Sequence, residues 1–408
     1  MKKVWDKWTR IALVKRILVG LILGAILGIA VPQATGIAIL GDVFVSALKA
    51  IAPLLVFFLV VSSLCNAGKS HGGVIKTVII LYMFSTVLAA VIAVFASMAF
   101  PVKMTLANAA TDTSAPQGIV EVLNNLLLNV VANPVSSLVN ANYVGILMWA
   151  VLLGLAFRAA DKMTKNVLAD VADGISVVVT WIINLAPFGI FGLVFNTVST
   201  NGLDIFTTYG KLLLLLVGCM LFIYFVTNPL LVYWCIRQNP YPLIFHCLKR
   251  SALTAFFTRS SAANIPVNMK VCEEMGLDRD TYSVTIPLGA TINMDGAAIT
   301  ITVMTMATAF TLGIHVDIPT AIILSFLAAL SACGASGVAG GSLLLIPMAC
   351  SLFGISDDIS MQVVAVGFII GVVQDSVETA LNSSSDLLLS ASAEFRQWRL
   401  EGKEIKFK

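Results

Sequence analysis

Four polar residues recur at short intervals inside one apolar stretch near the end of the chain. The segment GVVQDSVETALNSSSD, residues 371–386, contains Asp375, Glu378, Asn382 and Asp386. At 100° per residue these side chains fall within an arc of about 80° on one helix face, and Thr379 extends that face. An ionised carboxylate at the centre of a membrane-spanning helix costs about 2.5–3.5 kcal/mol, so this face must meet protein, water or cations. Such acids mark ion or substrate pathways.

A second polar cluster lies in TIPLGATINMDGAAIT, residues 285–300. One proline and two glycines are expected to loosen a helix around Asn293 and Asp295. Unwound carbonyl groups and half-helix ends coordinate Na⁺ in transporters. The stretch therefore predicts a broken helix beside a sodium site.

Two further segments place a Ser- or Gly-rich middle between short apolar arms. They are SALTAFFTRSSAANIPVNM, residues 251–269, and AALSACGASGVAGGSLLLIPM, residues 328–348. Non-helical backbone is tolerated at membrane depth only inside protein or along water, so we expect two opposed re-entrant hairpins. The alternative is a pair of small-residue packing faces. Arg259 lies within the first apolar stretch and is expected to pair with Glu378 or Asp375.

The composition identifies a membrane protein. Of the 408 residues 58% are hydrophobic and only 12% are charged, against about 25% charged in soluble domains. A helix needs about 20 apolar residues to cross the hydrocarbon core. Eight stretches are long enough, near residues 11–31, 43–64, 74–100, 122–157, 175–198, 209–236, 282–311 and 359–391.

The basic residues alternate between connections and predict the orientation. They gather at residues 2–16, 69–76, 158–165, 237–279 and 396–408. Of the 25 lysines and arginines, only Lys49, Lys103 and Lys211 fall elsewhere. Eight crossings with both termini cytoplasmic satisfy the positive-inside rule. The basic N-terminus resembles a signal peptide, but seven further spans favour a retained first helix.

Other chemistries are poorly supported. The seven cysteines include no C-x-x-C pair and the three histidines are isolated, so zinc and disulfide spacing are absent from the sequence. GASG, residues 334–337, fits a protease motif, but no histidine follows Ser336 to act as its base. An ion channel would usually repeat one filter around an axis, whereas this polar site comes from four unlike elements.

The motifs TRSSAANIPV, PLGATINMDG, SGVAGG and D-x-x-E-T-x-x-N-x-x-x-D together resemble the dicarboxylate/amino acid:cation symporter family, which includes glutamate transporters. The resemblance covers nearly the whole chain and is closest to the bacterial serine/threonine:sodium members. It implies an all-α polytopic membrane protein with eight transmembrane helices, two opposed re-entrant hairpins, inverted repeats and elevator-type transport. It also implies a homotrimer in the bacterial inner membrane.

The resemblance further divides the chain into two parts within one transmembrane unit, residues 1–408. The scaffold part would comprise residues 11–64 and 122–198. The transport part would comprise residues 74–100, 209–236, 243–272 (first hairpin), 282–311, 319–355 (second hairpin) and 359–391.

Three sodium sites follow from the family's motif positions. The first would use the backbone of Gly289, Asn293 and Asn382 with the carboxylate of Asp386. The second would use the carbonyls of Thr291, Ala332, Cys333 and Ala335. The third would join Asn293 and Asp295 to Tyr82, Ser85 and Thr86. Because Ser and Thr commonly bond their own helix, ordinary packing is the alternative for the last three.

The resemblance also implies a substrate site made by Ser260, Ser261, Val338, Asp375, Thr379 and Asn382. Backbone N–H groups at half-helix N-termini suit an α-carboxylate. Asp375 can accept charge-assisted hydrogen bonds from an α-ammonium group. A zwitterionic amino acid satisfies both ends.

Two departures from the family pattern bear on the substrate. Relatives that carry acidic substrates place an arginine where this chain has Glu378, and a threonine where it has Ala297. A substrate carboxylate would meet a like charge at Glu378, which argues against aspartate and glutamate. Serine, threonine and alanine are therefore the expected substrates, carried with Na⁺. Sodium- or proton-coupled transport of acidic amino acids or dicarboxylates is the alternative.

Membrane lipid is an expected partner, and nucleic acid is not.

Overall fold

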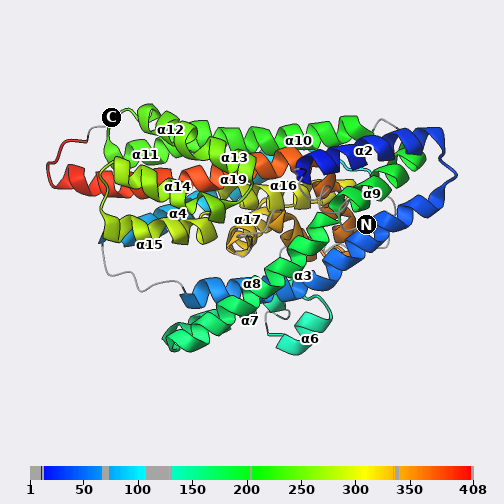
Figure 1. Ribbon diagram of the computed structural model, residues 1–408, viewed down its shortest axis with the longest axis horizontal. Helices are drawn as coiled ribbons and strands as arrows, with labels where there is room; N and C mark the ends of the chain where they lie inside the picture. Colours follow the sequence, from blue (N-terminus) through cyan, green and yellow to red (C-terminus); the bar gives the residue numbers. More distant parts are fainter. Residues whose placement is uncertain are drawn as a thin grey trace.

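The computed structural model describes residues 11, 13–66, 73–106, 128, 131–202, 205–333, 335 and 340–405. Within these ranges the regular structure is helical throughout and contains no strand (Figure 1). Six helical segments are long and apolar enough to cross a membrane: Thr35–Asn66, Gly73–Ala99, Lys162–Asn184, Phe206–Ile236, Arg279–Thr311 and Asp357–Leu400. The all-helical fold that the family resemblance implies is thus confirmed for the described residues, and several of its helices are apolar enough to cross a membrane.

One group of helices runs obliquely from the bottom of Figure 1 to its upper right. Within it α2 packs along α9, and α3 packs on α7, α8 and α9. Their bounds are α2 Leu13–Ala30, α3 Ile39–Asn66, α6 Pro134–Val139, α7 Tyr143–Ala156, α8 Lys162–Asn184 and α9 Ala186–Asn201. Short 3₁₀ turns, η1 Thr35–Ala38 and η2 Phe157–Ala159, lead into α3 and follow α7.

The other group extends to the left of Figure 1 and surrounds the longest helix, α19. Its bounds are α4 Gly73–Ala99, α10 Ile205–Phe222, η3 Ile223–Thr227, α11 Asn228–Ile236, α12 Tyr241–Cys247, η4 Leu248–Ala252, α13 Leu253–Thr258, α14 Ser261–Glu274, α15 Arg279–Ile292, α16 Asp295–Thr311, α17 Ile318–Ala332, η5 Gly341–Leu345, α18 Ile346–Ser351 and α19 Asp357–Leu400. Helices α4, α16 and α19 pack on one another, and α17 packs on α4 and α16.

Two segments have the broken course that the sequence indicates. In the first, η4 and α13 run to Thr258, Arg259 adopts a left-handed backbone with φ 50°, and α14 starts after the N-cap Ser260. In the second, α17 ends at Ala332, the described residues Cys333, Ala335 and Gly340 are not helical, and η5 and α18 follow. We call residues 241–274 the first hairpin and residues 318–351 the second hairpin.

The span expected over residues 282–311 is interrupted as anticipated. Helix α15 ends at Ile292, Asn293 and Met294 are non-helical, and α16 begins at Asp295. The break turns the carboxyl end of one half-helix and the amino end of the next toward the same point. Each end carries unpaired backbone groups and a partial charge, negative at the carboxyl end.

Two expected spans differ from the structure. The predicted span at 175–198 is wrong at its start, because α8 already begins at Lys162 and is followed by α9 after Leu185. The Asp161 side chain caps α8 by accepting from the backbone N–H of Thr164 at 2.8 Å. This hydrogen bond lowers the pKa of Asp161 below its usual value. Pro187, near the start of α9, cannot donate a backbone hydrogen bond and so interrupts the helix there.

The predicted single span at 122–157 is also divided where the structure describes it. Helix α6 ends at Val139, and α7 starts only at Tyr143. Ala141 has φ 52°, a left-handed conformation that breaks a helix. The Asn142 side chain then caps α7 by accepting from the N–H of Gly145 at 3.2 Å. Hydropathy averages across such a break and cannot detect it.

Candidate cation and substrate site

The polar face of α19 is buried, as the sequence requires. The helix runs unbroken for 44 residues, and five residues on this face are at most 6% exposed: Asp375, Glu378, Thr379, Asn382 and Asp386. Helices α4, α15 and α16 and both hairpins pack around it. The expectation that these groups face protein rather than lipid is confirmed.

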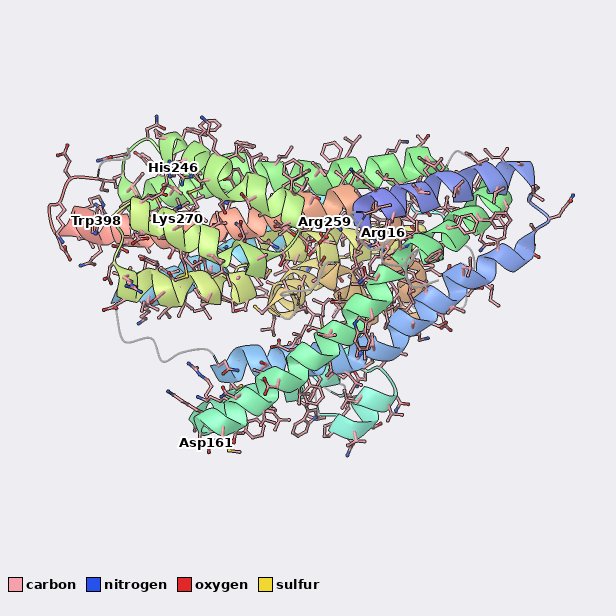
Figure 2. All side chains as sticks on the ribbon, in the orientation of Figure 1. Arg16, Asp161, His246, Arg259, Lys270 and Trp398 are labelled. Atoms are coloured by element: carbon pink, nitrogen blue, oxygen red, sulfur yellow. The ribbon has the colours of Figure 1, made fainter. Side chains whose placement is uncertain are left out.

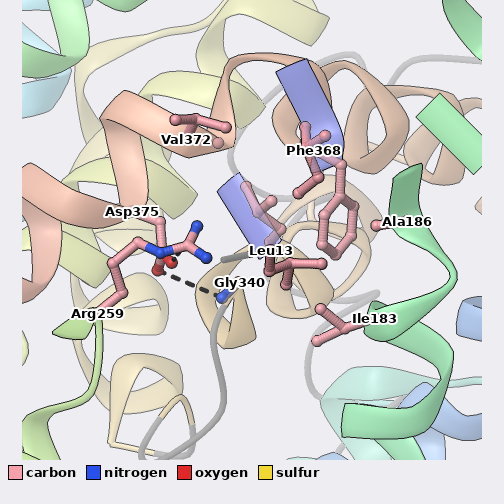
Figure 3. Close-up of a pocket in the computed structure, with 11 residues that line it drawn as sticks. Leu13, Ile183, Ala186, Arg259, Gly340, Phe368, Val372 and Asp375 are labelled. Atoms are coloured by element: carbon pink, nitrogen blue, oxygen red, sulfur yellow. Dashed lines mark hydrogen bonds and ion pairs between the residues drawn. The ribbon is translucent and has the colours of Figure 1, made fainter. Parts of the chain in front are cut away.

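Asp375 lies where the two hairpins meet (Figure 3). Its Oδ2 is 3.6 Å from the Arg259 guanidinium of the first hairpin. Its Oδ1 accepts from the backbone N–H of Gly340 in the second hairpin at 3.3 Å. The sequence left the partner of Arg259 open between two acids, and the structure selects Asp375. Figure 2 shows Arg259 midway along the molecule, far from Trp398 at one end.

A small cavity adjoins this ion pair. Its volume is about 20 Å³, and Leu13, Ile183 and Phe368 close it on the side away from Arg259 and Asp375. A cavity of this size holds about one water molecule. A molecule as large as an amino acid does not fit in this cavity.

Glu378 occupies a different environment from Asp375. Its Oε2 accepts from the hydroxyls of Thr300 at 2.6 Å and Ser342 at 2.9 Å, and from the amide of Gln374. These donors belong to α16, η5 and α19, so one carboxylate oxygen links the second hairpin to two long helices. Sequence reasoning missed all three donors. Their only signal was that each is a polar residue in an apolar run.

Four members of the first expected sodium set lie together. The Asn293 amide donates to Asp386 Oδ1 at 2.9 Å and lies 3.5 Å from the carbonyl of Asn382. A Cβ at Gly289 would lie only 2.8 Å from Asp386 Oδ1, so any side chain at that position would have to displace the carboxylate. Tyr82 of α4 donates to the carbonyl of Asp386 at 2.8 Å. The arrangement gathers carbonyl and carboxylate oxygens of the kind that Na⁺ uses.

Substituting alanine for Gly289 tests this geometry directly. The new methyl group would push the Asp386 carboxylate away by several tenths of an ångström. We expect the sodium concentration for half-maximal uptake to rise about tenfold, equivalent to about 1.4 kcal/mol. Gly174→Ala is the matched control, because a Cβ at this position in α8 meets nothing within 4 Å. Equal sodium dependence in the two variants would remove Gly289 from the cation site.

The Asp295 carboxylate gathers hydroxyls from α4. Ser85 donates to its Oδ2 at 2.8 Å, and the Thr86 hydroxyl lies 3.1 Å from its Oδ1. The same hydroxyl is 3.0 Å from the carbonyl of Tyr82, so Thr86 also has the partner in its own helix that the packing alternative invoked. Asp295 and Ser85 are fully buried. Three members of the third expected set, Asp295, Ser85 and Thr86, thus lie together across 210 residues of sequence. The other two members, Asn293 and Tyr82, donate to Asp386 instead.

The second expected sodium set lies at the ends of two helices. Helix α15 ends at Ile292 and α17 ends at Ala332. The Cys333 thiol is 3.8 Å from the carbonyl of Ile292, which places these two carboxyl-terminal ends side by side. The N–H of Ala335 donates to the carbonyl of Ala332 at 2.9 Å, and the Thr291 hydroxyl donates to the carbonyl of Leu288. Two converging helix C-termini favour a cation.

The remaining substrate residues are placed as follows. Ser260 caps α14 by accepting from the N–H of Ala263 at 3.2 Å, and Ser261 opens that helix. The Asn382 side-chain oxygen accepts from the N–H of Gly296 at 2.7 Å. Val338 lies outside the described residues.

An amide network that the sequence did not reveal fixes the first hairpin to α19. The Asn264 amide donates to the hydroxyls of Ser251 at 2.9 Å and Ser383 at 2.8 Å. Asn268 donates to the carbonyl of Ser383 at 2.8 Å. All four residues are buried, and hydrogen bonds in a buried environment are electrostatically stronger than in water. The first hairpin is therefore attached along its arms as well as at its tip.

Comparison with known proteins agrees with this geometry. The model of the sodium:dicarboxylate symporter family matches residues 13–394. The chain is 57% identical to the serine/threonine transporter SstT of Bifidobacterium adolescentis, over 99% of this chain and 94% of that protein. It is 55% and 56% identical to the serine/threonine transporter SstT of two Streptococcus thermophilus strains, over 98% of this chain and 100% of each relative. The chain belongs to the sodium:dicarboxylate symporter family.

Proposed function

We propose that this protein imports serine and threonine together with Na⁺. The observation that carries the proposal is the buried acidic face of α19, whose Asp375 meets both hairpin tips and whose Asp386 faces the broken α15–α16 helix. The full-length similarity to proteins named serine/threonine transporters supports the substrate class. Membership in a family of symporters excludes the protease alternative.

The proposed architecture has eight spans and two re-entrant hairpins. The six long apolar helices supply six spans, and α2 and α7 would supply the others. Both termini would lie in the cytoplasm, as the positive-inside rule supports, and the bacterial relatives favour the inner membrane. The homotrimer remains an expectation from the family resemblance.

The proposed movement is of the elevator type, with α4 and residues 205–400 sliding against α2, α3 and α7–α9. The second hairpin packs on the proposed scaffold, η5 on α3 and α18 on α7. The first hairpin packs mainly on α15 and α19, which belong to the proposed moving part. A small sliding surface of this kind suits rigid-body displacement.

Sodium would be held at the three oxygen-rich sets described above. Gly289, Asn293, Asn382 and Asp386 form the first, and Asp295 with Ser85, Thr86, Tyr82 and Asn293 forms the third. The carbonyls at Thr291, Ala332, Cys333 and Ala335 form the second. Bound Na⁺ would neutralise carboxylates whose charge is expensive at membrane depth.

The amino acid would replace Arg259 as the partner of Asp375. Its α-ammonium group would take over the position of the guanidinium, 3.6 Å from the carboxylate at present. Its α-carboxylate would accept from backbone N–H groups at the start of α14, beside Ser260 and Ser261. Thr379 or Asn382 would bond the substrate hydroxyl.

Glu378 would act against acidic substrates. Its carboxylate lies one helical turn from Asp375 and is buried, so a substrate carboxylate nearby would experience poorly screened repulsion. The three donors on its Oε2 hold it in place. A neutral side chain such as that of serine avoids this repulsion.

Uptake into proteoliposomes tests the function. We expect radiolabelled serine to accumulate under an inward Na⁺ gradient, and aspartate to accumulate less under the same gradient. An ionophore that collapses the Na⁺ gradient is the control for coupling. Aspartate uptake above serine uptake would reject the substrate assignment, and serine uptake indifferent to Na⁺ would reject the coupling.

A further inference from the structure

A long apolar groove runs between α4 and α10, away from the polar face of α19. Its volume is about 860 Å³, within the range of about 300–1,000 Å³ that is common for ligand pockets. One wall is a single stripe of α10, formed by Lys211, Leu214, Leu215, Gly218, Cys219 and Phe222. The other wall is a stripe of α4 that includes Ala96 and Ala99. Small residues on both helices create the depth of the groove.

The groove matches one leaflet of a bilayer in length and surface. From Lys211 to Phe222 it extends about 16 Å along α10, at 1.5 Å per residue. Half of the hydrocarbon core is about 15 Å. Leu214 is 75% exposed and Phe95 is 48% exposed, so apolar side chains line its rim.

Two lysines lie at one end of the groove, on the side of the membrane where this protein has few basic residues. By the orientation that the basic residues predict, α10 begins on the external side, where only Lys49, Lys103 and Lys211 lie. Lys49 is neutralised by Asp358 at 2.7 Å. Among the described residues, neither Lys103 nor Lys211 has a carboxylate within 4.0 Å. Lys103 follows Val102, which lines the groove, so both lysines stand at its external end.

We propose that this groove binds one anionic phospholipid of the outer leaflet, with its phosphate on Lys211 and an acyl chain between α4 and α10. The acyl chain of the lipid would fill an apolar groove as long as one leaflet is thick. Its phosphate would meet the ammonium group of Lys211, which has no anionic partner among the described residues. A lysine near an anionic lipid surface contributes about 1 kcal/mol. The lipid would contact the helix that carries Ser85 and Thr86 to Asp295.

Native mass spectrometry tests the proposal on full-length protein. The protein is extracted from vesicles with equal phosphatidylglycerol and phosphatidylcholine of identical chains, and retained lipids are counted. We expect phosphatidylglycerol to be enriched about fivefold on the unmodified protein. Lys211→Gln should retain lipid but lose the enrichment.

A matched pair of glycine variants tests the groove itself. A Cβ at Gly218 meets nothing within 4 Å, so Gly218→Leu places its side chain in the groove without a backbone clash. This variant should lose the retained lipid. Gly210→Leu is the control, because Gly210 is equally open on α10 but does not line the groove.

Three results would overturn the proposal. Enrichment unchanged in Lys211→Gln would remove the phosphate contact, and lipid retained in full by Gly218→Leu would remove the groove. The third result combines two observations: the unmodified protein retains no lipid, and a photoreactive residue at Leu214 cross-links two copies of the protein. The groove would then be an interface between copies. Lys211→Gln changes only an exposed side chain, so it remains informative even if Gly218→Leu fails to fold.

Discussion

Asp386→Asn is expected to reduce sodium-driven serine uptake about 100-fold. The Asp386 carboxylate is 1% exposed and accepts from Asn293 at 2.9 Å. The substitution keeps the shape of the side chain but removes its charge, and it introduces an amide donor that can face the amide of Asn293. A hydrogen bond to a charged group contributes about 1.5–3 kcal/mol, and a 100-fold loss of affinity corresponds to about 2.8 kcal/mol.

The measurement is the sodium dependence of the initial rate in proteoliposomes, at saturating serine. Asp317→Asn is a suitable control, because Asp317 is a carboxylate that caps α17 by accepting from Thr320 at 2.7 Å. It changes the same chemical group at a helix end rather than in the proposed site. If Asp386→Asn kept the sodium dependence of the unmodified protein, Asp386 would not be a cation ligand. Size-exclusion elution of both variants shows whether either has simply unfolded.

Cross-linking α3 to the start of α19 is expected to stop uptake almost completely. Lys49 of α3 and Asp358 of α19 form an ion pair at 2.7 Å, and the proposed mechanism assigns these helices to parts that slide past each other. Exposed pairs contribute only about 0–1 kcal/mol, so the natural contact can break during each cycle. A covalent link of similar length cannot break during the cycle, so it would hold the transport part in its present position.

The experiment uses Lys49→Cys with Asp358→Cys and a bifunctional thiol reagent that is cleaved by reduction. The seven native cysteines are buried, which limits their reaction. Uptake should fall as the fraction of cross-linked protein rises, and it should recover after reduction. Each single-cysteine variant, treated in the same way, should remain active. Full uptake by fully cross-linked protein would show that these two helices do not move apart, which would contradict the proposed division of the chain.

The chemistry of the site was more predictable than its individual contacts. Charged side chains in an apolar helix have few permitted surroundings, so the face that contains Asp375 and Asp386 had to be buried. The break at Asn293 was expected because proline and glycine weaken a helix wherever they occur. The left-handed turn at Arg259 shows the limit of such reasoning. A break in the Ser-rich middle of residues 251–269 was expected, but the left-handed backbone conformation of Arg259 was not.

Contacts between residues far apart in the sequence were harder to predict. The partner of Arg259 depended on which of two acids lay nearer a hairpin tip, and a helical wheel places both on the same face. The donors to Glu378 come from three elements, and nothing in sequence spacing joins Thr300 to Ser342. The start of α8 at Lys162 was missed because its first turns are polar, and hydropathy identifies only the apolar part of a helix.

The ion pair between Arg259 and Asp375 has a consequence for the return half of a transport cycle. After an amino acid has been released, an unpaired Asp375 carboxylate would be costly to move back through the membrane, because a charge there must either lose its water or keep water around it. In the proposed mechanism the Arg259 guanidinium would neutralise Asp375 whenever no substrate is bound, so the empty transport part could return without an unpaired carboxylate. Each amino acid that binds from outside would then have to displace Arg259 from Asp375.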